Sequence, residues 1–385
     1  MTIKKINLRN FYSIIIALCP LLYNYRAFSV GKSNISIGLL IMLCFIPIGI
    51  FENIKKRNYI PFPIVLFFLY FIVNCHFNAY YILFSILVIT TWMMTKTPLI
   101  NYLVIYKVII CISILSSICI IIQFIFHFVT GNHIPMNIPS LLCNDYTFLV
   151  KTGKQIGSNM YRPSAFFLEP SHNSVYVLVA LVALIRDEIE LNSNHLREII
   201  IITIGVVLST SGIGFFCVGL LLFYRLFFKE KLTIRKIVNI FFVGIICCLC
   251  IFFLLRIDFI QQIVNRVLGN YEGYNAITGR TFAYDWLIPD MKKYEKIWGV
   301  GYLNRPVFYV TGHILHRYCL GLIGVFLFWF MLFHNITKKT YRGLIITVFY
   351  FGLYFTTSNI YSSALIFFGV LIFEEKKNPR FEVHL

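Results

Sequence analysis

The stretch VIICISILSSICIIIQFIFHFV, residues 108–129, contains no Asp, Glu, Lys or Arg and decides the class of this protein. A membrane-spanning helix needs roughly 20 mainly apolar residues. Comparable runs recur along the chain, since 59% of its 385 residues are hydrophobic, 13% are charged and the mean hydropathy is +0.79. A soluble domain carries roughly 25% charged residues. The composition therefore predicts an all-α, polytopic integral membrane protein in which residues 1–385 form a single membrane domain.

Apolar runs separated by basic residues predict about twelve transmembrane helices. Two of the connections between them, 130–165 and 256–312, are much longer than the others. Long loops on a helical scaffold are where function usually concentrates. We expect the helices at residues 11–28, 35–51, 60–75, 80–94, 108–129, 166–185, 198–208, 212–228, 237–255, 313–333, 343–357 and 360–373.

The formal net charge of +18 comes from 34 Lys and Arg residues against 16 Asp and Glu residues. Such a charge could indicate nucleic-acid binding, but the basic residues form short runs between apolar stretches, as cytoplasmic loops of membrane proteins do. The turns at 76–79, 209–211 and 357–359 contain no Lys or Arg. We therefore expect no nucleic-acid partner, an even number of spans, cytoplasmic termini and two long extracytoplasmic loops. The segments expected in the cytoplasm are 1–10, 52–59, 95–107, 186–197, 229–236, 334–342 and 374–385.

Many of the 11 cysteines lie inside apolar runs, where they are typical small hydrophobic side chains. The group Cys247, Cys248 and Cys250, for example, is embedded in FFVGIICCLCIFFLL. This context is a poor one for a zinc site. We expect no metal site, no disulfide framework and no cofactor.

The best candidate for a functional site is RPSAFFLEPSHN, residues 162–173, which closes the first long loop and opens a predicted helix. Pro170 suits the first turn of a helix, and Glu169 and His172 are three residues apart and can face the same way. Arg162 could neutralise Glu169 or bind an anion. An alternative is that Glu169 is a carboxylate favoured by the helix dipole and Arg162 an interfacial anchor.

This stretch resembles the R-x-S-x-F-x-E-P-S segment of bacterial O-antigen and capsule repeat-unit polymerases. The loop 256–312 is similar to the major periplasmic loop of that family, and the resemblance covers about residues 155–330. Further segments that resemble family motifs are the hydroxyl-rich turn Ser209-Thr210-Ser211-Gly212 and the glycine motifs Gly279-Arg280, Gly299-Val300-Gly301-Tyr302 and Gly321-Leu322-Ile323-Gly324.

The resemblance implies a glycosyl transfer on the outer face of the bacterial plasma membrane. The growing glycan would move from undecaprenyl diphosphate to the sugar end of another lipid-linked repeat unit, without a metal. A chain-length regulator and a flippase would be partners, beside the lipid bilayer. The implied catalytic base is Glu169 or, second, His313; the implied diphosphate ligands are Arg162, Arg280, Arg305 and Arg317; other substrate contacts are His172, Tyr274 and Trp286.

One position departs from the family pattern. Many relatives have a His-Asn pair about eleven residues before the first glycine of the tenth span, where this chain has Val310. The nearest histidine is His313, and His316 and Arg317 follow one turn later. All three could instead form a polar helix end at the membrane interface.

Three other functions are alternatives, and the ligase shares the layout. An O-antigen ligase would use the same donor with a different acceptor. A flippase or transporter for lipid-linked oligosaccharides would have many charged groups inside its spans, whereas most predicted spans here contain no Asp or Glu in their apolar cores. A purely structural membrane protein gives no reason for the large charged loop.

Overall fold

The computed structural model contains two compact units, residues 1–108 with 280–385 and residues 109–279. The prediction of a single membrane domain stays a prediction. The residues that the structure describes are 8–30, 33–97, 99–142, 151–154, 161–186, 195–212, 214–215, 217–221, 261, 265, 284–306, 310–334, 341–355 and 363–374.

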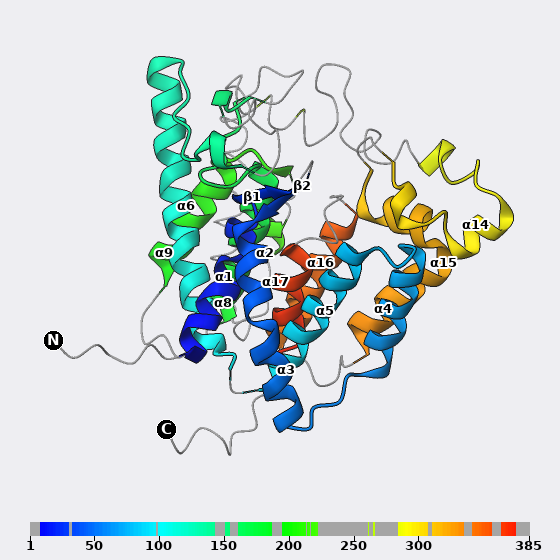
Figure 1. The fold of residues 1–385 in the computed structure, drawn as a ribbon. Helices are drawn as coiled ribbons and strands as arrows, with labels where there is room; N and C mark the ends of the chain where they lie inside the picture. Colours follow the sequence, from blue (N-terminus) through cyan, green and yellow to red (C-terminus); the bar gives the residue numbers. More distant parts are fainter. Residues whose placement is uncertain are drawn as a thin grey trace, which may run out of the picture. The chain divides into compact units, whose positions relative to one another are not determined.

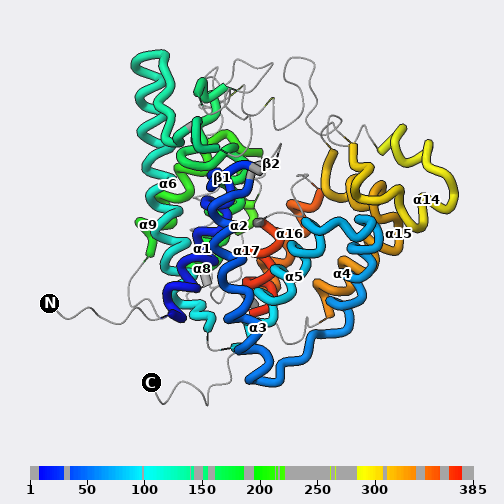
Figure 2. Tube along the Cα trace, viewed as in Figure 1, coloured from blue at the N-terminus to red at the C-terminus, as the bar shows by residue number. Residues whose placement is uncertain are grey.

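The first unit joins helices from the two ends of the chain. Helices α1 and α5 pack against α17, and α4 packs against α15, as Figures 1 and 2 show. The described elements of this unit are α1 (Leu8–Leu22), β1 (Arg26–Val30), β2 (Ser33–Ser36), α2 (Ile37–Cys44), α3 (Ile46–Lys55), α4 (Phe62–Asn74), α5 (Ala79–Met93), η1 (Met94–Lys96), α14 (Lys293–Trp298), η3 (Tyr302–Asn304), α15 (Gly312–Phe333), α16 (Tyr341–Tyr354) and α17 (Ser363–Ile372).

The core of the first unit is aromatic. Phe67 and Phe71 on α4 are fully buried, and the Phe67 ring lies 5.4 Å from that of Phe328 on α15. The Phe71 ring lies 5.5 Å from that of Tyr302. Membrane helices associate through close packing rather than through water exclusion, and each aromatic pair adds about 0.5–1.5 kcal/mol beyond area burial. This packing holds α4, α15 and the segment before α15 together.

The second unit contains the site-bearing stretch. Its described elements are the greater part of α6 (Tyr102–Thr130), η2 (Pro139–Leu141), α8 (Pro170–Arg186) and α9 (Leu196–Leu208), which packs against α8. The side chains of residues 176–185 on α8 are all buried. A helix that is apolar on every side belongs in an interior, so α8 lies at the centre of this unit.

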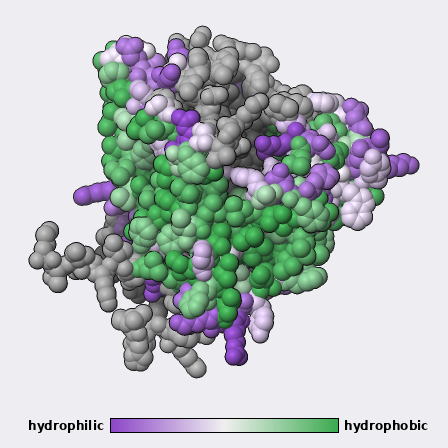
Figure 3. Space-filling view, viewed as in Figure 1, coloured by the Kyte–Doolittle hydropathy of each residue, from purple (hydrophilic) through white to green (hydrophobic). Residues whose placement is uncertain are grey.

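The predicted membrane class is confirmed in its coarse form. Four described helical segments, 37–55, 79–96, 102–130 and 312–333, are long and apolar enough to cross a membrane. Shorter apolar helices occur at 8–22, 62–74, 170–185 and 343–354. Figure 3 shows a broad hydrophobic surface over the labelled helices of the first unit. The predicted span 237–255 lies outside the described residues, and the count of twelve stays a prediction.

Two elements differ from the sequence prediction. The first predicted span, 11–28, ends early, because α1 stops at Leu22 and an antiparallel hairpin of β1 and β2 follows, so the described part is not purely helical. The Asn24 side chain donates to the Pro20 carbonyl (3.2 Å) beside the helix end. Helix α6 starts at Tyr102 rather than at 108, since Lys107 is exposed and a lysine stem can lie along apolar surface.

Candidate functional site

The start of α8 places a carboxylate at a helix N-terminus, as the sequence predicted. Glu169 directly precedes Pro170, the first residue of α8, and its backbone carbonyl accepts from the Asn173 N–H at 3.2 Å. Glu169 is half-buried, and its Oε2 accepts a hydrogen bond from the Ser171 hydroxyl at 3.0 Å. The positive end of the helix dipole favours negative charge here. His172 is half-buried on the same first turn.

The segment that carries Arg162 is held by two buried amide side chains. Gln123 on α6 accepts from the Ala165 N–H (3.0 Å) and donates to the Ile134 carbonyl (2.8 Å). Asn137 donates to the carbonyls of Ala165 (3.3 Å) and Phe167 (3.1 Å). Buried backbone groups must be paired. These two amides therefore fix the backbone between Arg162 and Glu169.

Tyr161, next to Arg162, anchors the other side of this segment. Its hydroxyl donates to the Gln123 carbonyl at 3.1 Å and lies 2.8 Å from His133 Nδ1. Its ring stacks on His127 with the centroids 3.7 Å apart. Burial raises the pKa of the Tyr161 phenol, so the hydroxyl stays neutral and keeps its donor hydrogen. The backbone N–H of Arg162 donates to the Gly153 carbonyl at 2.7 Å.

A cluster of buried hydroxyls follows the first turn of α8. The Ser116 hydroxyl on α6 donates to Asn173 Oδ1, and both side chains are fully buried. The Ser174 hydroxyl donates to the Pro170 carbonyl at 2.9 Å and lies 3.4 Å from the Ser209 hydroxyl. The structure therefore brings the hydroxyl-rich turn at 209–212 next to the α8 start. The Asn173 Nδ2 is buried and has no hydrogen-bond partner among the described residues.

In the first unit, helix α15 carries the second group of candidates. His313 is half-buried beside the rings of Tyr284 and Phe355, whose centroids are 6.3 Å and 5.0 Å away. His316 is fully buried, 4.7 Å from the Phe328 ring and edge-on to it. Arg317 is half-buried, and its Nη1 has no hydrogen-bond partner among the described residues. Trp286 is 41% exposed.

Helix α15 breaks at Gly321, and the break holds the glycine loop that precedes the helix. Gly321 has φ +63° and ψ −169°, outside the helical region. The freed carbonyls of Tyr318 and Cys319 accept from the N–H groups of Val300 and Gly301, both at 3.0 Å. A Cβ on Gly321 would lie 2.2 Å from the Ile297 carbonyl oxygen. The glycine motifs at 299–302 and 321–324, about twenty residues apart in the sequence, are therefore in direct backbone contact.

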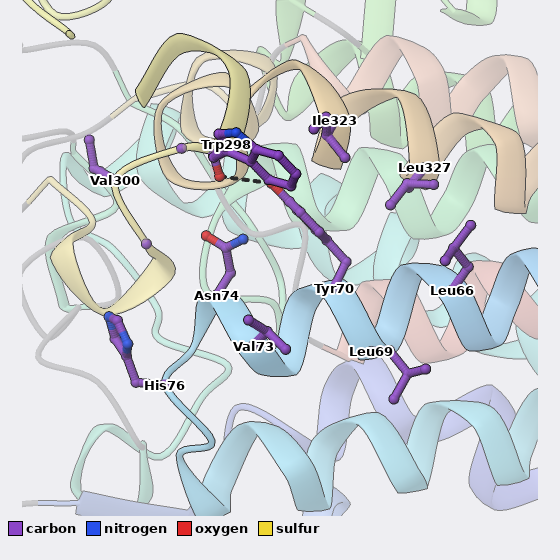
Figure 4. Close-up of a pocket in the computed structure, with 12 residues that line it drawn as sticks. Leu66, Leu69, Tyr70, Val73, Asn74, His76, Trp298, Val300, Ile323 and Leu327 are labelled. Atoms are coloured by element: carbon purple, nitrogen blue, oxygen red, sulfur yellow. Dashed lines mark hydrogen bonds between the residues drawn. The ribbon is translucent and has the colours of Figure 1, made fainter. Parts of the chain in front are cut away.

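Tyr70 on α4 completes this arrangement, which we call the α15 break. Its hydroxyl lies 2.7 Å from the Trp298 carbonyl oxygen and 2.8 Å from that of Leu320, as Figure 4 shows for Trp298. A Cβ on Gly324 would lie 3.1 Å from the Tyr70 ring. The two glycines of Gly321-x-x-Gly324 therefore let a loop and a tyrosine approach α15.

Arg305 lies just after this loop, on the surface. Its guanidinium carbon is 5.9 Å from the centroid of the Tyr302 ring, a cation–π geometry. Burial raises the pKa of the Tyr302 phenol, so it stays neutral beside Arg305. The guanidinium is always charged and is exposed, which suits contact with an anion.

The predicted site residues fall into two groups. Arg162, Glu169 and His172 lie in the second unit, and their backbone segment is fixed by the contacts above. Arg280 and Tyr274 lie outside the described residues. The first unit carries Trp286, Arg305, His313 and Arg317.

Sequence reasoning missed the residues that hold these groups in place. Gln123 and Asn137 make buried polar contacts, and Tyr70 makes a partly exposed one. A usable indication existed for Gln123, because it is a lone amide in an otherwise apolar run of α6. Tyr70 gave none, because aromatic residues surround it.

Among the described residues, no group of three or more His, Cys, Asp and Glu side chains could hold a metal ion. Comparisons with protein-family models, with curated proteins and with solved structures give no match to this chain.

Proposed function

We propose that this protein is a polymerase that joins undecaprenyl-diphosphate-linked oligosaccharide repeat units into a surface polysaccharide. The observation that carries the proposal is the α8 start. There a half-buried carboxylate sits at a helix N-terminus, seven residues after Arg162, and Gln123 and Asn137 hold the backbone between these two residues. A base and a cation near one another are what a glycosyl transfer from a lipid diphosphate requires.

In the proposed reaction, a hydroxyl oxygen of the acceptor sugar attacks the anomeric carbon of the donor glycan. The bond between that carbon and the diphosphate oxygen breaks, and undecaprenyl diphosphate leaves with the electron pair. Glu169 accepts the hydroxyl proton, with His313 as the second candidate. Arginine suits the leaving group because its guanidinium binds two phosphate oxygens at once. The candidates for this role are Arg162, Arg280, Arg305 and Arg317.

The same proposal includes an orientation, with both termini in the cytoplasm. In the first unit, segments predicted on one side of the membrane meet each other: Asn101 donates to Asn10 at 3.1 Å and the Tyr106 hydroxyl donates to Glu374 at 3.0 Å. Two segments predicted on the other side also meet. A Cβ on Gly301 would lie 3.5 Å from His76 Nε2. These groupings support the alternation of basic segments on which the orientation rests.

The decisive test is Glu169→Gln, with Glu198→Gln as the matched control. Glu198 is also a partly buried carboxylate in the first turn of a helix, α9, but lies outside the candidate site. We expect Glu169→Gln to abolish polymer, to leave single lipid-linked repeat units in the membrane and to keep normal protein abundance. We expect Glu198→Gln to give the normal ladder of chain lengths on a polysaccharide gel.

These assays also distinguish a polymerase from the ligase and flippase alternatives. A polymerase defect leaves single repeat units that can still be attached to their final acceptor, whereas a ligase defect leaves full-length polymer on the lipid carrier. A flippase defect leaves repeat units that an external glycosidase cannot reach. Normal chain lengths in Glu169→Gln would remove Glu169 from the catalytic role.

A further inference from the structure

A groove runs along α4 in the first unit, between this helix and α15, and takes no part in the proposed chemistry. Its volume is about 670 Å³. Leu66 and Leu69 on α4 and Leu327 on α15 line its apolar end, and Asn74 and His76 line the other, as Figure 4 shows. The groove is therefore mainly apolar, with two polar side chains at one end.

The groove opens on a surface that suits lipid rather than water. Leu69 and Val73 on α4 are 57% and 56% exposed, while Phe67 and Phe71 on the opposite face of α4 are fully buried. On α15, Phe326 is 66% exposed. A large exposed apolar patch marks a membrane or partner contact, and α15 is long and apolar enough to cross a membrane. The open side of the groove therefore suits contact with hydrocarbon.

The length of the groove fits a hydrocarbon chain. From Asn74 to Leu66 a helix advances about 12 Å, which approaches the roughly 15 Å depth of half a bilayer core. A lipid chain that lies along α4 can therefore run from the end of the groove at Asn74 toward the apolar interior of the membrane.

Residues 298–301, which line the groove, lie in a basic stretch of the chain. Between residues 292 and 305 the chain has four basic residues, Lys292, Lys293, Lys296 and Arg305, and one acidic residue. That residue, Glu295, already accepts hydrogen bonds from the Lys292 N–H (2.8 Å) and the Tyr294 hydroxyl (3.2 Å). Trp298, which also lines the groove, is 56% exposed and of the type enriched at membrane–water interfaces. This end suits an anionic headgroup.

We propose that the groove between α4 and α15 binds an anionic glycerophospholipid of the surrounding bilayer. One acyl chain lies along Leu66, Leu69 and Leu327, and the phosphate meets His76 and the basic segment that ends at Arg305. This lipid is a bound component of the protein and not its glycosyl donor. The site rests on the geometry of the groove and shares only Arg305 with the candidate diphosphate ligands of the proposed polymerase.

The test is native mass spectrometry of the purified full-length protein, released from nanodiscs of equal parts phosphatidylglycerol and phosphatidylcholine. We expect wild type to retain one phosphatidylglycerol. Leu69→Trp fills the groove and is expected to lower the retained phosphatidylglycerol by about tenfold, the equivalent of roughly two methylenes losing their contacts. Val348→Trp is the control, since Val348 is 66% exposed on α16 and does not line the groove.

Two further variants and a competition with undecaprenyl phosphate test the lipid site. Arg305→Gln should retain the two lipids equally, because the acyl groove remains while the phosphate contact weakens. Val73→Trp replaces Leu69→Trp if the latter does not reach the membrane. Equal phosphatidylglycerol retention by Leu69→Trp and Val348→Trp would overturn the proposal. So would displacement of the retained lipid by one equivalent of undecaprenyl phosphate, which would assign the groove to the carrier lipid instead.

Discussion

At the α8 start the backbone is held by side chains, whereas at the α15 break it is held by other backbone groups. Gln123 and Asn137 donate to and accept from the segment before α8. At the α15 break, the N–H groups of Val300 and Gly301 bond to carbonyls of α15 directly. Side-chain contacts can be replaced one at a time, whereas at the α15 break a Cβ on Gly299 or Gly321 would lie 2.1 Å or 2.2 Å from a facing backbone carbonyl oxygen. The two regions should therefore respond differently to substitution.

The largest effect is expected for Gly321→Ala. Its Cβ would lie 2.2 Å from the Ile297 carbonyl oxygen, and its φ of +63° with ψ of −169° is a conformation that essentially only glycine adopts. We expect a loss of about 3 kcal/mol or more in the free energy of unfolding. Thermal unfolding in detergent, followed by size-exclusion chromatography, measures it.

The control for this substitution is Gly352→Ala on α16, where an added Cβ meets nothing within 4 Å. Alanine has the better helix propensity, so this variant should be unchanged or more stable by up to about 1 kcal/mol. Equal melting temperatures for the two variants would mean that the backbone of α15 does not break at Gly321.

A smaller effect is expected for Gln123→Leu. This change leaves the Ala165 N–H and the Ile134 carbonyl without their partner, at a cost of about 1–3 kcal/mol for a buried polar group. It should also loosen the segment that carries Arg162, so that polymer length falls together with the melting temperature. Asn132→Ala, in the exposed part of the same loop, should change neither. Loss of stability with normal chain lengths would separate Gln123 from the candidate site.

The smallest effect is expected for Tyr70→Phe. The ring keeps its packing, and only the hydroxyl contact with the Trp298 and Leu320 carbonyls is lost, which is worth about 1 kcal/mol. Tyr80→Phe is the control, because its hydroxyl has an exposed contact of 3.3 Å with Tyr23. If Tyr70→Phe melts like Tyr80→Phe, backbone bonds alone hold the α15 break.

The helices themselves were largely predictable from sequence. The predicted span 60–75 corresponds to α4 (Phe62–Asn74), 166–185 to α8 (Pro170–Arg186) and 313–333 to α15 (Gly312–Phe333). Long apolar runs predict helices because the backbone groups of a helix form hydrogen bonds within the same segment. Such a segment therefore costs the least free energy to place in lipid. The pattern needs no knowledge of the rest of the chain.

The sites were predictable only in part. The residue types at 162–172 indicated a charged site at a helix start, and the structure has Glu169 at that start. The hairpin of β1 and β2 was missed, since an apolar run that continues past Pro20 does not reveal where its helix ends. The pairing of Asn173 with Ser116 was missed because it depends on which faces of two helices meet.

By itself, the sequence determined the membrane class, the positions of most helices and the residue types available for chemistry, because each of these depends on local composition. Only the tertiary structure decided that α15 breaks at Gly321. Two glycines spaced by two residues are compatible with an unbroken helix. The break forms because a loop distant in sequence brings the N–H groups of Val300 and Gly301 to the carbonyls of Tyr318 and Cys319. These two carbonyls are therefore not left without a hydrogen bond.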